Sequence, residues 1–350
     1  MENRDVGFSI ERRRFLAETF KIPPLLLGIV TLEKISQQLS GLSPQASGNA
    51  QAVQKTSVDV DQYRHELQQY WELNHADTVK EVFGTIPYKL TALRQALSQC
   101  SRGREEILLL LCDYHQFVAN FLRDQGLFDE SAKHLTKALQ RIESMDEKQF
   151  RELRALIYHR MTITLQEQGR LEHALVACKK ARKESNTLPP ALVGAILLEE
   201  GHILAKLVQN EKDKTKALQT IEEAGKIIRS GQAKDDPFFL KLNMDRYHLT
   251  RGSALVAMQW NQDALYELGE VRGKQKRRQA YTNILQAQAL LNQKLYTPAI
   301  ELAIEGLVVA REIHSLINVQ RVQNIYKQLK TSDFKDNPEV ARLHFLLNYT

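Results

Sequence analysis

A recurring spacing of small and bulky residues limits what this chain can fold into. Two glycines are each followed by residues at the same intervals of two, five, nine and twelve: Phe128, Ser131, Leu135 and Ala138 after Gly126, and Leu171, Ala174, Cys178 and Ala181 after Gly169. Such a glycine ends one helix in a left-handed cap conformation. The residues that follow lie on one stripe of the next helix, where small side chains allow close packing. The spacing therefore predicts helical hairpins.

Three later stretches keep the spacing in part. They contain Ala217, Ile221 and Ala224 in "DKTKALQTIEEAGKI", Ala264, Leu268 and Val271 in "QWNQDALYELGEV", and Tyr296, Ala299, Ala303 and Gly306 in "KLYTPAIELAIEGL". The helix before "QWNQ" fits the pattern only with a shift of frame. A single hairpin cannot bury its apolar face, so neighbouring hairpins must stack. Only 16 glycines and 9 prolines interrupt 350 residues, and alternating strand patterns are missing. We predict an all-α fold, an α-solenoid of stacked helical hairpins.

The pattern resembles the tetratricopeptide repeat, in which a small residue in the first helix precedes Gly-x-aromatic-x-x-Ala and then a large and a small apolar position. The best copy consists of Ala119, Leu122, Gly126, Phe128, Ser131, Leu135 and Ala138. The interval of 43 residues from Ala174 to Ala217 exceeds the usual 34. In this the chain is similar to bacterial regulators that join a helix-turn-helix domain to degenerate repeats. The resemblance implies a superhelix that binds peptides or proteins along the surface lined by the first helix of each hairpin.

Three segments are expected along the chain. Residues 1–39 form an N-terminal helical arm, residues 40–57, rich in Ser, Gly, Gln and Ala, form a linker, and residues 58–350 form the array. Pro87 should break the first helix pair, and Pro338 should start the last helix.

The arm carries Arg12-Arg13 before Phe15-Leu16, which is the spelling of a twin-arginine export signal. Glu18, Lys21 and Pro23-Pro24 interrupt the apolar core that such a signal needs. We therefore expect a cytoplasmic protein whose arm docks on the repeats or on a partner, with export as the alternative.

The implied binding groove has a polar and basic lining. Counting back from the glycine of each hairpin gives Gln116, Asn120 and Arg123, then His159, Ile163 and Gln166, then His202, Lys206 and Gln209. Amides there could pair with the backbone of an extended peptide, and Arg123 and Lys206 could bind a carboxylate. Three dipeptides, Tyr114-His115, Tyr158-His159 and Tyr247-His248, lie in first helices. They form either an aromatic row along the groove or core tyrosines followed by partly exposed histidines.

The net charge of +6 comes from 48 basic and 42 acidic residues, so the charges are well mixed. The densest basic run contains Arg272, Lys274, Lys276, Arg277 and Arg278. It is either a phosphate-binding patch or a solvated helix start. Only ten residues precede Glu11, where a helix-turn-helix domain would stand, so direct nucleic-acid binding is not expected.

Catalytic and metal-binding motifs are missing from the sequence. Cys100, Cys112 and Cys178 are odd in number and lack CxxC spacing. We therefore expect no enzyme activity, no metal and no cofactor, and no uncharged run reaches the length of a membrane span. The favoured function is a bacterial regulatory sensor or adaptor that binds a peptide or protein and that could form homo-oligomers. The alternative is a structural scaffold subunit of a larger complex.

Overall fold

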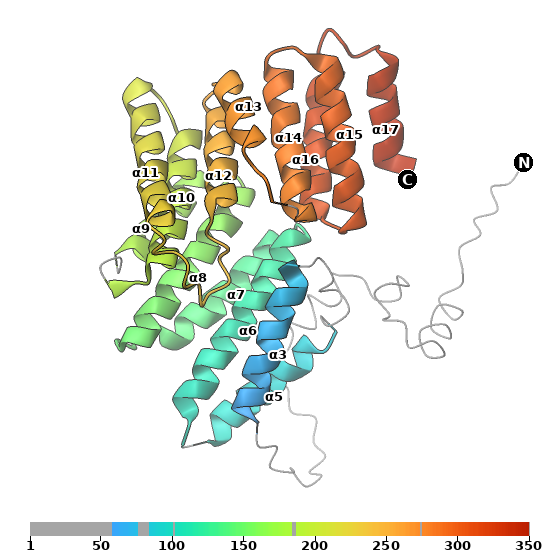
Figure 1. Cartoon of the computed structure of the whole chain (residues 1–350). Helices are drawn as coiled ribbons and strands as arrows, with labels where there is room; N and C mark the ends of the chain where they lie inside the picture. The colour runs from blue at the N-terminus through green and yellow to red at the C-terminus, as the bar shows by residue number, and fades with distance from the viewer. Residues whose placement is uncertain (1–57, 76–83, 101, 184–186, 274, 350) are drawn as a thin grey trace, which may run out of the picture. The chain divides into compact units, whose positions relative to one another are not determined.

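The chain is helical throughout the part that the computed structural model describes, residues 58–75, 84–100, 102–183, 187–273 and 275–349 (Figure 1). These residues form 14 α-helices and no strand, which confirms the predicted all-α class. The arm at 1–39 and the linker at 40–57 lie outside the described residues.

The helices follow one another with short connections. Their bounds are α3 (Val60–His75), α5 (Ile86–Gln99), α6 (Arg104–Asp124), α7 (Phe128–Ile142), α8 (Lys148–Glu167), α9 (Leu171–Arg182), α10 (Pro190–Lys206), α11 (Glu211–Arg229), α12 (Met244–Ala257), α13 (Asn261–Gly269), α14 (Lys276–Asn292), α15 (Tyr296–Glu312), α16 (Leu316–Lys330) and α17 (Pro338–Tyr349). As predicted, Pro87 lies in the first turn of α5 and Pro338 begins α17.

The chain divides into two compact units, and the division falls within α6 after Tyr114. The first unit contains α3, α5 and the first part of α6. The Tyr114 hydroxyl donates to the backbone oxygen of Tyr63 at 3.1 Å, and Leu90 and Leu93 are fully buried there. The second unit runs from His115 onward. It contains all of the predicted groove residues and the described members of the basic run.

Neighbouring helices of the second unit pack in pairs, α8 with α9, α10 with α11, α12 with α13, and α14 with α15. The small-residue stripes predicted from the sequence form the contact between helices. Their members are at most 1% exposed: Ser131, Ala138, Ala174, Cys178, Ala181, Ala217, Ala224, Ala264, Ala299 and Ala303. Larger side chains such as Leu135, Ile221 and Leu268 fill the space between the stripes.

The same left-handed turn follows five of these helices. The residues at its centre have a positive φ: Gly126 (73°), Gly169 (74°), Gln259 (64°), Lys294 (62°) and His314 (54°). In each case the next residue donates its N–H back into the last turn of the helix, as Leu127 does to Leu122 at 2.9 Å. Glycine suits this conformation best, but three other side chains adopt it here.

In some helix pairs, the residue that contacts the second helix is not the one predicted by counting from the repeat glycine. The α6–α7 contact lies at Ala119, whose backbone oxygen accepts from Ser131 Oγ at 2.7 Å. In α12 the equivalent position is Gly252, where an added methyl group would lie 2.6 Å from Leu268. Gly252 precedes Gln259 by the same interval as Ala119 precedes Gly126, so the predicted shift of frame before "QWNQ" is wrong.

The frame shift lies instead between α10 and α11. A methyl group on Gly201 would lie 2.8 Å from the backbone oxygen of Ala217, so Gly201 is the close-contact position of α10. The chain between these two residues is about one helical turn longer than between Ala119 and Ser131. In this register His202 corresponds to Asn120, the residue after the contact position, rather than to Gln116 as predicted.

None of the described helices has both the length and the apolar character that crossing a bilayer requires.

Candidate functional site

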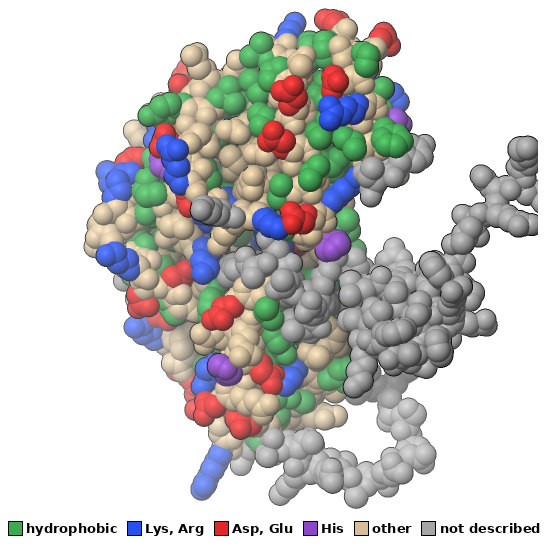
Figure 2. All heavy atoms as spheres, turned by 45° about the vertical axis from the view of Figure 1, so that its right-hand side comes forward, with side chains coloured by type: hydrophobic (Ala, Val, Ile, Leu, Met, Phe, Trp, Pro, Cys, Tyr) green, Lys and Arg blue, Asp and Glu red, His purple; other side chains and the backbone are tan. Residues whose placement is uncertain are grey.

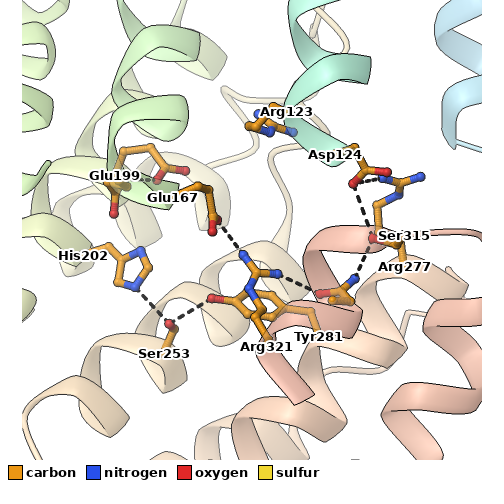
Figure 3. Close-up of polar contacts among 12 residues, drawn as sticks. Arg123, Asp124, Glu167, Glu199, His202, Ser253, Arg277, Tyr281, Ser315 and Arg321 are labelled. Atoms are coloured by element: carbon orange, nitrogen blue, oxygen red, sulfur yellow. Dashed lines mark hydrogen bonds and ion pairs between the residues drawn. The ribbon is translucent and has the colours of Figure 1, made fainter. Parts of the chain in front are cut away.

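Polar side chains of α6, α8 and α10 meet within the second unit (Figure 3). Gln116 is buried, and its Oε1 accepts from Arg160 Nε at 3.0 Å. Asn120 Oδ1 accepts from Arg123 Nη2 at 2.8 Å. Gln116, Asn120 and Arg123 of α6 thus lie in one polar surface with Arg160 of α8.

Two glutamates connect this surface to later helices. Glu199 accepts from Gln166 Nε2 at 2.8 Å and from Arg246 Nη2 at 3.1 Å. Glu167 accepts from Arg321 Nη2 at 2.5 Å. Because α8, α12 and α16 donate to these two carboxylates of α8 and α10, the acidic groups are held by charge-assisted hydrogen bonds from distant parts of the chain.

His202 begins a second chain of contacts. Its Nε2 lies 2.9 Å from Ser253 Oγ, which lies 3.3 Å from the Tyr281 hydroxyl. The Arg321 guanidinium lies over the Tyr281 ring, 4.1 Å from the ring centre. Figure 3 shows this route from His202 to the arginine that also binds Glu167.

The C-terminal helices reach the end of α6 at Asp124. Arg277 forms an ion pair with Asp124, and Ser315 Oγ donates to the same carboxylate at 3.5 Å. Asn318 bonds both Ser315 and Arg321, at 3.2 and 2.7 Å. We refer to the contacts of Asp124 and Glu167 with Arg277, Ser315, Asn318 and Arg321 as the closing contacts. Their partners are separated by up to 191 residues.

Burial favours the neutral form of His159 and His202, the two histidines predicted for the groove. His159 is 2% exposed, and burial together with Arg246, Arg160 and Arg123 lowers its pKa well below 6.5. Burial, Lys206 and Arg321 lower the pKa of His202 in the same way. A neutral imidazole offers one donor and one acceptor nitrogen, so both rings act as hydrogen-bonding groups rather than as cations.

Two buried atoms of the surface have no hydrogen-bond partner among the described residues. They are Nδ1 of His159 and Oε1 of Gln166, a side chain that is 6% exposed. Leaving a buried polar atom without a partner costs about 1–3 kcal/mol. Such atoms are therefore candidates for contact with a bound molecule.

The other predicted groove residues lie at the edge of this surface or outside it. Ile163 is half-buried on α8, and Lys206 is exposed at the last residue of α10. Gln209 lies beyond the end of α10, is exposed, and bonds Asp213 through its backbone N–H at 3.2 Å. The added turn between α10 and α11 accounts for this position of Gln209.

The three Tyr-His pairs behave differently from one another. Both Tyr114 and His115 are fully buried. At Tyr158-His159 the histidine is the buried member, whereas at Tyr247-His248 the tyrosine is buried and the histidine is half-buried. Only the last pair has a core tyrosine followed by a partly exposed histidine, so neither sequence-based interpretation holds for all three.

The described members of the basic run are paired with carboxylates. Arg272, Lys276, Arg277 and Arg278 form ion pairs with Glu270, Glu312, Asp124 and Asp245, respectively. Lys274 lies outside the described residues. On the face shown in Figure 2, basic and acidic side chains are interspersed. These pairs favour a structural role over a phosphate-binding patch.

Groups typical of metal or thiol chemistry are not gathered here. Within the described ranges no cluster of His, Cys, Asp and Glu could hold a metal ion. Cys178 is buried and burial raises the pKa of its thiol, so the thiolate form is disfavoured.

The chain matches none of the family models and none of the curated proteins with which it was compared.

Several site residues could not be predicted from sequence. Arg160, Glu199, Arg246 and Arg321 lie outside the glycine-based count, and each makes its contact with a residue of another hairpin. A signal for Glu199 was available in part, because it is a polar residue on the mainly apolar helix α10. Arg321 had no such signal, since its partner Glu167 is 154 residues away.

Proposed function

We propose that this chain is a non-enzymatic binding protein, a tetratricopeptide-like α-solenoid that holds a peptide or an extended protein segment on the polar surface of its second unit. Helices packed in pairs support the repeat architecture, as does the left-handed turn that follows five helices. Close contacts at Ala119, Gly201 and Gly252 support it further. The resemblance to bacterial regulators makes a cytoplasmic sensor or adaptor the role that we propose.

The observation that carries the proposal is the pair of unsatisfied buried atoms, Nδ1 of His159 and Oε1 of Gln166. Both atoms belong to first helices, which line the partner surface in tetratricopeptide arrays. An extended peptide carries N–H and C=O groups at regular intervals, and these could supply the missing partners.

One contact in this surface has the form of a nucleophile and a base, namely Ser253 with His202. Ser253 is only 6% exposed, and its hydroxyl also contacts Tyr281. Among the described residues no carboxylate is hydrogen-bonded to His202 to orient the ring. We therefore interpret the pair as part of the buried polar network rather than as a catalytic dyad.

The proposal can be tested with a pool of random synthetic hexapeptides and the purified full chain. Peptides that the protein retains are measured by mass spectrometry for the wild type and for Asn120→Ala. Asn120 is half-buried and bonds only side-chain groups in the described structure, so the variant should fold normally. Losing a hydrogen bond of about 1 kcal/mol should reduce retention about 5-fold.

The matched control is Asn324→Ala, because Asn324 is exposed on α16. It should retain peptides as the wild type does. If the wild type retains no peptide, the proposal is wrong. A stoichiometric protein complex that forms equally well with Asn120→Ala would favour the scaffold function instead.

A further inference from the structure

Residues 230–243, which connect α11 to α12, form the longest connection between the described helices of the second unit. Within it, residues 236–242, "DPFFLKL", run past α8 (Figure 1). We refer to residues 236–242 as the strap. Asp236 defines its conformation, because Oδ1 accepts from the backbone N–H of Leu240 at 3.0 Å and Oδ2 accepts from that of Lys241 at 2.7 Å.

Two arginines of the polar surface donate to backbone carbonyls of the strap. Arg160 on α8 donates through Nη2 to the Phe238 oxygen at 3.3 Å. Arg246 on α12 donates through Nη1 to the Leu240 oxygen at 2.6 Å. An extended peptide carries the same carbonyl groups, so the strap occupies donors that could otherwise bind the backbone of another segment.

The same two arginines contact residues that the sequence predicts for the groove. Arg160 Nε donates to Gln116 Oε1 at 3.0 Å. Arg246 Nη2 donates to Glu199 at 3.1 Å, and Glu199 accepts from Gln166 Nε2 at 2.8 Å. Direct hydrogen bonds therefore join the strap to the surface on which we propose that a peptide binds.

Apolar side chains of the strap are also seated in the second unit. Leu240 and Leu242 are 8% and 6% exposed. Gly194 on α10 makes room for Leu242, because an added methyl group there would lie 2.5 Å from Leu242 Cδ2. The strap thus has two bound carbonyls and two buried leucines, a combination of main-chain bonds and side-chain pockets that also holds bound peptides.

The strap adopts this position in a strained conformation. Phe239 and Lys241 have φ angles of 55° and 52°, in the left-handed region that side chains other than glycine resist. A separate segment could offer carbonyls to Arg160 and Arg246 without this strain. A competing segment is therefore favoured relative to the strap.

We infer that the strap is an autoinhibitory segment, which occupies Arg160 and Arg246 in the free protein and is displaced when a peptide binds. The inference rests on the proposed function and adds regulation to it. The apparent affinity for a peptide is reduced to the extent that the strap occupies the surface. Loosening the strap should therefore strengthen peptide binding, and tightening it should weaken binding.

Asp236→Asn loosens the strap in the full-length protein. It replaces one acceptor oxygen with an amide nitrogen, so only one of the two backbone N–H groups keeps its side-chain acceptor. Retention of the random hexapeptide pool should rise about 10-fold, the effect expected for loss of one charge-assisted hydrogen bond in the strap. The matched control is Asp235→Asn, which makes the same change at the neighbouring exposed residue and should retain peptides as the wild type does.

Lys241→Gly tightens the strap, because glycine adopts the left-handed conformation without the steric cost. Retention should fall about 3- to 5-fold. Lys241→Ala is its matched control. Alanine removes the same exposed side chain but keeps the steric cost, so retention should stay at the wild-type level.

Hydrogen exchange measures displacement of the strap directly. When peptides recovered from the wild type are added back to it, the backbone N–H groups of Leu240 and Lys241 should exchange faster, because Asp236 no longer protects them. Circular dichroism melting shows whether each variant folds, and exchange in the wild type decides the question if a variant does not.

The outcomes separate this inference from the proposed function. Equal retention by the wild type and folded Asp236→Asn, or unchanged exchange of the strap with peptide bound, would overturn the inference and leave peptide binding intact. If neither the wild type nor Asp236→Asn retains a peptide, both the inference and the proposed function are wrong.

Discussion

At the scale of single residues, the polar surface combines neutral histidines with half-buried arginines. His159 and His202 both have a pKa lowered by burial and by nearby cations, Arg123 and Arg246 for the first and Lys206 and Arg321 for the second. Protonating either ring in the folded protein would add a cation to a region that already contains several. The free energy of unfolding therefore depends on pH.

We predict that the protein loses stability as the pH falls below about 6.5, the ordinary pKa of histidine. In that range the unfolded chain takes up protons at His159 and His202, whereas the folded chain keeps both rings neutral. The unfolded state thus binds more protons, and acid favours unfolding. Each ring should reduce the free energy of unfolding by up to about 1.4 kcal/mol per pH unit. Urea denaturation at a series of pH values measures this slope.

Comparison with His159→Gln and His202→Gln isolates the two rings, because every other titrating group is common to all the proteins. Each variant should have a shallower slope than the wild type. A double variant that loses stability with acid as steeply as the wild type would show that these rings are not the source.

Single residues also show how far sequence reasoning reached. Gln116, His159 and Gln166 were predicted by counting back from the repeat glycines, as the tetratricopeptide resemblance implies, and Gln116 lies against Arg160 and Gln166 against Glu199. The partners of these residues were not predictable. Arg160 and Glu199 contact them across hairpins, and those contacts depend on how the hairpins stack.

At the scale of elements, the spacing of small residues sets the distance between paired helices. Gly201 on α10 faces α11, where an added methyl group would lie 2.8 Å from the Ala217 backbone oxygen and 2.5 Å from the Ile221 side chain. The Ala217 backbone oxygen could make room for a methyl group only if α11 moved away from α10. The glycine is therefore required by the close approach of the helices and not by its own backbone angles.

Gly201→Ala should destabilise the protein by about 1–3 kcal/mol, because overpacking a close helix contact forces the helices apart. Gly269→Ala is the matched control. Gly269 is the last residue of α13, and an added methyl group would meet no atom within 4 Å. Alanine there should be neutral or should stabilise by up to about 1 kcal/mol. Urea unfolding of both variants tests the register, and equal effects would show that Gly201 is not the contact position.

The elements themselves were the most predictable part of the fold. Pro87 in the first turn of α5, Pro338 at the start of α17, and the turns at Gly126 and Gly169 follow from local backbone preferences. The register of later hairpins was less predictable. Gln259 and Lys294 adopt the left-handed turn without the glycine that identifies it, so the sequence lacked the marker for these positions.

At the scale of the whole molecule, the closing contacts join the beginning and the end of the second unit. Arg321 on α16 bonds Glu167 at the end of α8, and Ser315 bonds Asp124 at the end of α6. Local sequence patterns do not predict such contacts. The contacts depend on how each helix pair between α8 and α16 is rotated relative to the next. They hold α16 against α8 and the end of α6.

We predict that Arg321→Met loosens α16 without unfolding the rest of the second unit. Arg321 and Glu167 are 23% and 25% exposed, so water screens part of their attraction, and a double-mutant cycle with Glu167→Gln should give a coupling of about 1 kcal/mol. Hydrogen exchange should become faster across residues 316–330, because that helix loses its contact with α8 while its own backbone bonds remain. Arg342→Met removes one partner of the exposed pair with Glu339 on α17 and should leave exchange in 316–330 unchanged. If hydrogen exchange in α16 is the same in Arg321→Met and in the wild type, apolar packing rather than this ion pair holds α16 against α8.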